Sequence, residues 1–389
     1  MRLTQVYQSF LEVGFRPFFL GAAIFSLFSM SLWSGIYLFQ LPIPFDVITP
    51  FEWHAHEMFY GYAFAVITGF LLTSVKTWTK MPTAHGASLL FLFLLWLGAR
   101  VFFSFGSTYL WLAATFDILF ALTLSTILTH RIIKAKQWKQ LGIIAKLQLI
   151  SFCNILFYLG AFGFLENGVT WGIFGGLYIV IALILTMGRR VIPFFIERAA
   201  NDTTQLSNSR WLDLSSLMFF LAFAINELFF FDIILTAYLT LALFIINAVR
   251  LLRWHHPVIW RQGLLWSIYL SFWMITFGFA LIALPYFTGF DVPKLLAIHA
   301  FTVGGIGMIT IGMISRVSLA HTGRNVYQPP AAIKYAFIAM LCSAIVRVFL
   351  PLLDIWPYET LIGLSQIFWV IAFAIFIAVY APILLKPKQ

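Results

Sequence analysis

One segment of the chain reads HAHEMFYGYAFAVITGFLLTSV, from His54 to Val75. A helix needs about 20 mostly apolar residues to cross the hydrocarbon core of a bilayer, and this run is long enough. It opens, however, with two imidazoles and a carboxylate, those of His54, His56 and Glu57. Ionisable groups at membrane depth are costly and usually mark ligand, ion or proton chemistry. The segment therefore predicts a membrane-spanning helix whose polar first turn has a functional role.

The composition of the whole chain agrees with this interpretation. Of its 389 residues, 62% are hydrophobic and only 10% are charged, and the mean hydropathy is +0.95. Soluble domains carry roughly 25% charged residues. We predict an all-α, polytopic membrane protein that forms a single transmembrane domain, residues 1–389. We expect no removable targeting segment, and we interpret Cys153 and Cys342 as buried small side chains rather than a disulfide or a thiolate site.

Twelve apolar runs are long enough to span a membrane. Their approximate bounds are 17–40, 54–75, 86–105, 108–129, 146–165, 169–188, 211–229, 232–252, 264–286, 294–315, 332–352 and 357–383. The division of 86–129 into two runs rests on the short break at Phe105-Gly106-Ser107. All connections are short, which leaves no room for an extramembrane domain.

The basic residues predict the orientation. All but three of the 24 lysines and arginines fall toward one side of the predicted spans, and the exceptions are Arg100, Lys294 and Arg347. The positive-inside rule then places both termini and the basic loops in the cytoplasm. The net charge of +10 is therefore an orientation signal and does not indicate a nucleic-acid partner. No phosphate-binding glycine loop is present, so we do not expect an ATP-driven pump.

Three of the eight histidines share the predicted outer leaflet. His54 and His56 begin the second span, and His299 lies near the start of the tenth. Residues two apart on a helix point about 200° away from each other, so His54 and His56 address one small site only if the first turn is unwound. His54 is in line with Gly61 and Gly69, a small-residue face that favours close helix approach. His56 is in line with Tyr60.

The second and tenth spans also resemble each other. Gly61 and Gly69 follow His56 at offsets of five and thirteen residues, and Gly304 and Gly312 follow His299 at the same offsets. This pattern is either the vestige of an internal repeat, which often flanks the site of a membrane protein, or a chance result of the high glycine content.

Imidazole is a common ligand for haem iron, copper and zinc, and a haem needs only one or two such ligands. We therefore predict that spans two and ten meet and hold a metal centre near the outer face. Glu57 or Glu52 would accept the second N–H of a bound imidazole. Arg100 and Arg347 are candidates for haem propionates; the alternative is pairing with Asp117 or Glu57. For the histidines the alternative is contact with headgroups at the membrane interface.

Two polar clusters are predicted on the cytoplasmic side. One is residues 187–195, with Arg189 and Arg190, and the other is residues 315–324, with Arg316 and His321. Cations at inner helix ends orient the chain, and a second site facing the cytoplasm is the alternative interpretation. Asp117 lies deep in the fourth span, so we expect it to be paired or protonated, and a proton-relay role is a further hypothesis.

The motifs FRPFF (15–19), WHAHEM (53–58), GFLLT (69–73), GRRVIPFF (188–195) and RVSLAHTGR (316–324) together resemble the NnrS family. The resemblance covers nearly the whole chain. It implies a twelve-span protein of the bacterial cytoplasmic (inner) membrane that contains b-type haem and copper and is linked to nitric oxide, denitrification and nitrosative stress. The histidine motifs of the family correspond to His54, His56, His299 and His321. Ala320 stands where we expect glycine, which leaves the adjacent histidine in place.

Three hypotheses follow for the function. The first is a haem- and copper-binding protein that responds to or protects against nitric oxide, with nitric-oxide-related redox activity at a centre near the outer face. Electrons would then come from a respiratory donor or the quinone pool, since the chain has no soluble electron-carrier module. The second is a twelve-span transporter of a metal ion or small metabolite. The third is a cofactor-free assembly factor for a respiratory enzyme.

Overall fold

The computed structural model describes residues 3–42, 45–200 and 204–389, and within these ranges the chain is helical with no strand. Arg2, one of the basic residues on the predicted cytoplasmic side, lies outside the described residues. Within the described ranges, twelve helices are long and apolar enough to cross a membrane, which confirms the predicted all-α, multi-pass membrane fold. The orientation of the termini stays a prediction.

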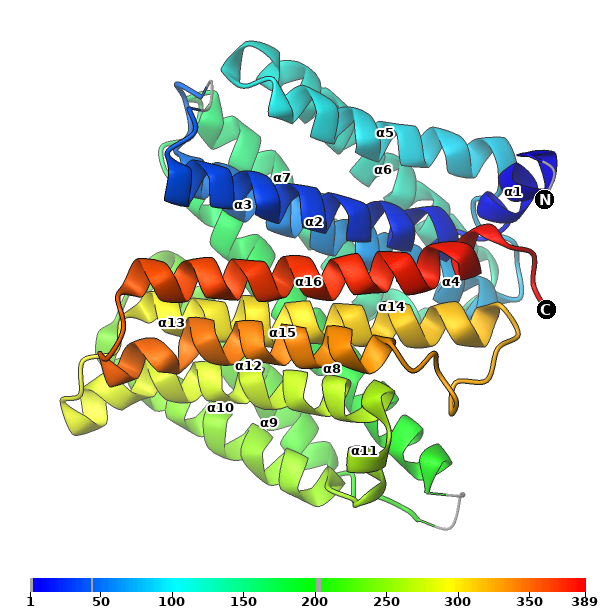
Figure 1. Ribbon diagram of the computed structural model, residues 1–389. Helices are drawn as coiled ribbons and strands as arrows, with labels where there is room; N and C mark the ends of the chain where they lie inside the picture. Colours follow the sequence, from blue (N-terminus) through cyan, green and yellow to red (C-terminus); the bar gives the residue numbers. More distant parts are fainter. Residues whose placement is uncertain (1–2, 43–44, 201–203) are drawn as a thin grey trace. The chain divides into compact units, whose positions relative to one another are not determined.

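The spans follow one another along the chain, joined by short connections (Figure 1). Eight of them are α2 (Phe15–Phe39), α5 (Gly86–Ser104), α8 (Gly168–Ala199), α10 (Ile233–Trp254), α12 (Gly263–Thr288), α16 (Tyr358–Leu385), α6 with a preceding 3₁₀ turn (Ser107–Lys134) and α7 with a preceding 3₁₀ turn (Trp138–Ala161). The other four are composite: α3, η1 and α4 (Pro50–Thr79), α9 and η4 (Arg210–Phe230), α13, η5 and α14 (Lys294–His321), and α15 and η6 (Ile333–Leu353). Short helices α1 (Leu3–Phe10) and α11 (Val258–Arg261) lie outside the spans.

Most span boundaries agree with the prediction to within six residues. Two differ more: the fifth span begins at Trp138 rather than 146, and the sixth continues to Ala199 rather than 188. Both differences lie where basic residues enter the helix. Hydropathy marks where the apolar run ends, whereas the backbone hydrogen bonds of a helix continue into the interface beyond it.

The predicted break between the third and fourth spans is present. Gly106 has φ of +81° there, in the region that residues with a side chain rarely adopt, and it separates α5 from the 3₁₀ turn that begins at Ser107. The two helices then run side by side as an antiparallel pair (Figure 1).

The contacts of the chain group into two compact units. Unit 1 comprises residues 1–180, 317–326 and 376–389, and unit 2 comprises residues 181–316 and 327–375. Helices α8, α14 (Met308–His321) and α16 contribute residues to both units. The single transmembrane domain stays a prediction, and each unit is described by itself below.

Many large apolar side chains face outward. Trp211 is 80% exposed, Phe164 78% and Ile233 75%. A soluble protein rarely presents so much apolar surface, whereas lipid tails cover it without cost. The buried positions instead include polar and charged side chains, and two clusters of these are described next.

Candidate functional site

The span that carries the histidine motif begins at a well-defined cap. Thr49 precedes Pro50, the first residue of α3 (Pro50–His56), and its hydroxyl accepts a hydrogen bond from the Glu52 amide. The Glu52 carboxylate in turn accepts one from the Thr49 amide at 2.6 Å. This reciprocal capping box fixes where the helix starts. The Glu52 carboxylate is therefore already hydrogen-bonded at the start of the helix, and Glu57 is the carboxylate that contacts a histidine.

A π-helix follows immediately after His56. This segment, η1 (Glu57–Ala63), leads into α4 (Phe64–Thr79). In the tenth span, His299 ends α13 (Lys294–His299), and the π-helix η5 (Ala300–Gly307) follows at once. Gly61 lies inside η1, and Gly304 lies inside η5. The matching offsets in the sequence thus coincide with the same change of backbone, and π segments are frequent at functional sites.

His56 lies in a buried cluster of charged and polar groups in unit 1. Arg100, on α5, donates hydrogen bonds to Glu57 Oε1 and to Asp117 Oδ2, and all three side chains are at most 3% exposed. Tyr158 donates to Asp117 Oδ2 at 2.7 Å. Asp117 is therefore paired, as expected, and Arg100 takes the predicted alternative of pairing with both carboxylates.

Both ring nitrogens of His56 contact oxygen atoms. Nε2 lies 2.9 Å from Asn154 Oδ1 and 3.8 Å from Asp117 Oδ2, and Nδ1 lies 3.1 Å from Glu57 Oε1. An amide oxygen only accepts, so Nε2 carries a proton and donates it. The Nδ1–Oε1 contact then holds one more proton, on either the imidazole or the carboxyl group, because two bare acceptors would repel each other. In both cases the cluster is neutral overall and holds one proton that two groups can share.

Aromatic rings enclose this cluster. The Phe103 ring stacks on His56 with centroids 4.6 Å apart, and Phe157 lies 4.3 Å away on a tilted plane. Tyr60 lies 4.9 Å away, as its predicted alignment with His56 requires, and its hydroxyl donates to the Gly172 carbonyl at 2.6 Å. Because these rings exclude water, the hydrogen bonds and ion pairs inside are stronger than they would be in solvent.

His54 lies on another face of the same span. Its ring stacks on Trp33 of α2, with centroids 4.5 Å apart and planes 9° from parallel, and it is partly exposed. The glycines aligned with His54 face the same helix, since a Cβ at Gly61 would meet Phe25 and one at Gly69 would meet Phe19. The first turn is helical, and the two histidines address different surroundings, as helix geometry predicts.

His299 and Arg347 belong to unit 2. The Nδ1 of His299 lies 2.8 Å from the Leu295 carbonyl oxygen and donates to it, which leaves the ring lone pair on Nε2. Helix α15 (Ile333–Val348), which carries Arg347, packs against α13 and η5. Arg347 is 7% exposed and donates to the Tyr358 hydroxyl at 2.7 Å. Within the described residues it forms no ion pair with a carboxylate.

His321 ends α14 in unit 1. It is exposed, and its ring centroid lies 5.8 Å from that of Phe15 in the FRPFF motif. Across the part of the chain that the structure describes, no three histidine, cysteine, aspartate or glutamate side chains are grouped so that they could hold a metal ion. His54, His56 and His321 lie in unit 1 and His299 in unit 2, so a centre shared by spans two and ten stays a prediction.

Two residues of the cluster were not singled out from the sequence. Asn154 and Tyr158 lie one turn apart on α7 (Leu141–Ala161), and both are buried. An asparagine within an apolar span is the signal that could have identified this face, because a buried amide must find hydrogen-bond partners.

The comparisons with known proteins are consistent with the motifs described above. No curated protein matches the chain. A family model described as NnrS protein matches residues 9–388, which is nearly the whole chain, and the protein therefore belongs to the NnrS family.

Proposed function

We propose that this protein is a haem- and copper-binding integral protein of the bacterial cytoplasmic membrane that acts in the response to nitric oxide. Membership of the NnrS family suggests a nitric-oxide-related membrane protein. The twelve candidate spans agree with a multi-pass location. Nitric oxide is small and apolar enough to reach a buried site through lipid.

The observation that carries the proposal is the hydrogen bond of His299. Metal-bound imidazoles typically donate their other ring N–H to a carbonyl or carboxylate, which fixes the tautomer and the ring orientation. His299 has this arrangement, with Nδ1 donating to the Leu295 carbonyl and the lone pair on Nε2. It also lies where the backbone changes to the π-helix η5, which contains Gly304 and Gly305. We therefore assign His299 as the residue that would coordinate the haem iron through Nε2.

Arg347 supports the same assignment. A buried cation without a carboxylate partner is costly, and a bound anion would offset that cost. Arg347 contacts only the Tyr358 hydroxyl among hydrogen-bond partners in the described residues, and its helix packs against the segments that carry His299. It is suited to bind a haem propionate. Arg100 is not, because its guanidinium already contacts two carboxylates.

The residues fit haem better than a three-ligand copper site. A haem can be held by a single imidazole, which His299 can supply. Copper ligation by His56 first requires one of its two hydrogen bonds to open, and His54 and His321 remain the other predicted ligands. When bound, ferrous haem or copper(I) supplies the atom that nitric oxide coordinates. Electrons for any turnover would come from a respiratory donor or the quinone pool.

A visible absorption spectrum of the purified full-length protein tests this proposal. We expect a Soret band and stoichiometric iron in the native protein. The His299→Ala variant should lose the band, and Arg347→Gln should lower haem occupancy. His130→Ala, at an exposed histidine outside these segments, should leave both unchanged. Elution as a single species of native size would show that the variants are folded.

The outcome that contradicts the proposal is also defined. A native protein with no chromophore, and with no iron or copper by elemental analysis, would exclude a resident redox metal. A normal spectrum in folded His299→Ala would reject this ligand assignment. The first result would favour the transporter hypothesis.

A further inference from the structure

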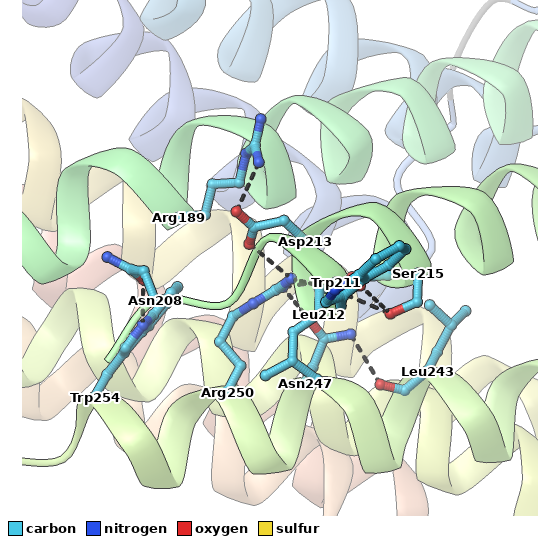
Figure 2. Close-up of polar contacts among 11 residues, drawn as sticks. Arg189, Asn208, Trp211, Leu212, Asp213, Ser215, Leu243, Asn247, Arg250 and Trp254 are labelled. Atoms are coloured by element: carbon cyan, nitrogen blue, oxygen red, sulfur yellow. Dashed lines mark hydrogen bonds and ion pairs between the residues drawn. The ribbon is translucent and has the colours of Figure 1, made fainter. Parts of the chain in front are cut away.

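A second polar site lies in unit 2, away from the histidines. Helices α8, α9 (Arg210–Ile225) and α10 line a partly open cavity of about 220 Å³. Its lining contains three arginines, Arg189, Arg210 and Arg250, and one carboxylate, that of Asp213. Figure 2 shows Asp213 between Arg189 and Arg250. We call this cavity the arginine pocket.

Arg250 is the lining residue of the arginine pocket that several hydrogen bonds hold in one position. Its Nη1 donates to Asn247 Oδ1 at 2.6 Å, and its Nη2 donates to the Leu212 carbonyl at 2.8 Å and to Asp213 Oδ1 at 3.2 Å. The side chain is 3% exposed. Asn247 thus helps to hold Arg250, and Arg250 in turn contacts Asp213, so most of the donors of Arg250 are already used (Figure 2).

The two other arginines bring charge that Asp213 does not neutralise. Arg189 donates to Asp213 Oδ2 at 2.7 Å, but its side chain remains 33% exposed. Arg210 is exposed and forms no hydrogen bond or ion pair with another described residue. One carboxylate cannot balance three guanidinium groups, so the arginine pocket carries excess positive charge and open N–H donors.

The arginine pocket lies at the ends of its helices. Arg210 is the first residue of α9, and Arg250 is in the last turn but one of α10, which ends at Trp254. Arg189 follows more than 20 residues of α8, about the length that crosses the hydrocarbon core. Trp211, 80% exposed, and Leu214, 50% exposed, lie beside it. Tryptophans and arginines at such ends mark the membrane interface, where apolar side chains meet lipid.

We propose that the arginine pocket binds a phosphate group, carried either by the headgroup of an anionic phospholipid or by free phosphate. Guanidinium groups match phosphate oxygens with paired donors, and basic pockets between membrane helices at the interface are suited to anionic headgroups. Arg189 and Arg210 contact the phosphate oxygens, and Leu214 and Leu217 line the side along which an acyl chain would leave. The site is independent of haem or copper binding.

Native mass spectrometry of the full-length protein in neutral detergent tests this proposal. The probes are phosphatidylglycerol, phosphatidylcholine and inorganic phosphate, each added separately, and inorganic phosphate is also added to the protein with phosphatidylglycerol bound. We expect phosphatidylglycerol or phosphate to bind, and Arg210→Gln and Arg189→Gln each to weaken that binding about tenfold, as the loss of one charged hydrogen-bond donor predicts. Arg253→Gln removes an exposed charge near the same end of α10, outside the lining, and should change little.

Each outcome either tests the proposal or identifies the source of the phosphate group. Binding of phosphatidylglycerol alone identifies the lipid headgroup, and displacement of the lipid by inorganic phosphate identifies the free anion. Equal weakening by Arg253→Gln and Arg210→Gln would show a general surface-charge effect and overturn the proposal. If neither phosphatidylglycerol nor inorganic phosphate binds, the proposal is also overturned. The same follows if phosphatidylcholine binds as well as phosphatidylglycerol does. Arg210→Gln alters an exposed side chain, so it keeps the test valid if Arg189→Gln fails to fold.

Discussion

At the scale of single residues, the function of a charge depends on its surroundings. The sequence alone predicts Arg16 to be one of the cations that orient the chain. In the structure it is 1% exposed and donates to the Leu384 carbonyl at 2.9 Å and to the Lys386 carbonyl. It thereby satisfies backbone groups left without partners at the end of α16. Arg16 is a structural cap, whatever its effect on orientation.

The predicted cytoplasmic clusters meet through one such residue. Arg316, from the second cluster, lies with its guanidinium 3.8 Å from the ring centroid of Phe195, from the first. Arg316 is 5% exposed, so the ring face replaces part of its lost hydration. The two motifs therefore have a packing role in unit 2 in addition to any orienting effect.

The Arg100 cluster yields a prediction at this scale. Arg100→Met leaves Glu57 and Asp117 buried without their cation, which should cost roughly 3–5 kcal/mol. We expect a marked fall in the melting temperature of the purified protein in detergent. Arg253→Met, at an exposed site, should shift it little, and adding Asp117→Asn to Arg100→Met should recover part of the loss. An unchanged melting temperature in Arg100→Met would contradict the buried-pair description.

At the scale of elements, the π-helices are the main departure from the expected spans. A π segment holds one residue more than the α-helix it interrupts, so it changes which residues face a neighbour on either side of it. Periodicity analysis assumes 3.6 residues per turn throughout, so its predicted faces are shifted beyond such a segment, although Gly69 still faces α2 on the far side of η1. His56 and Tyr60 still lie side by side because they are only about one turn apart.

Close packing between α7 and α8 leads to a second prediction. A Cβ at Gly160 would lie 2.8 Å from the Cα of Gly168 and closer still to the Val169 amide nitrogen. These are backbone atoms, which cannot move aside as a flexible side chain can. Gly160→Ala should therefore lower the melting temperature of the protein.

The same helix provides the control for this substitution. Gly142, also on α7, has open space where a Cβ would be. Gly142→Ala should be neutral or stabilise by up to about 1 kcal/mol, since alanine favours a helix over glycine. If the two variants melt alike, the close approach of α7 and α8 is not present in the folded protein.

At the scale of the whole molecule, the prediction concerns the direction of the spans. An even number of spans, twelve among the described residues, predicts that both termini lie on one side, and the basic loops predict that this side is the cytoplasm. A green fluorescent protein fused after Gln389 should therefore fluoresce. A cysteine in place of Asp46 should react with a membrane-impermeant maleimide in intact cells, whereas one in place of Lys139 should not. The reverse labelling pattern would invert the assigned orientation.

Much of the architecture could be predicted before any coordinates. The number of spans, the break at Gly106, the pairing of Asp117 and the separation of His54 from His56 all follow from hydropathy, glycine and helix geometry. These are local properties, set by residues within one or two turns. The ends of the fifth and sixth spans were less well predicted, because hydropathy follows the lipid boundary and not the backbone hydrogen bonds.

The amino-acid sequence by itself determined the membrane class, the count of spans and the helices that carry the ionisable groups, because the bilayer imposes length and polarity on each span separately. Only the tertiary structure decided the partners of those groups. It joins Arg100 to Glu57 and Asp117, His56 to Asn154, and Arg250 to Asp213. A buried charge must find its counterpart within a few ångströms, and which residue stands there depends on helices that are distant in sequence and meet only on packing.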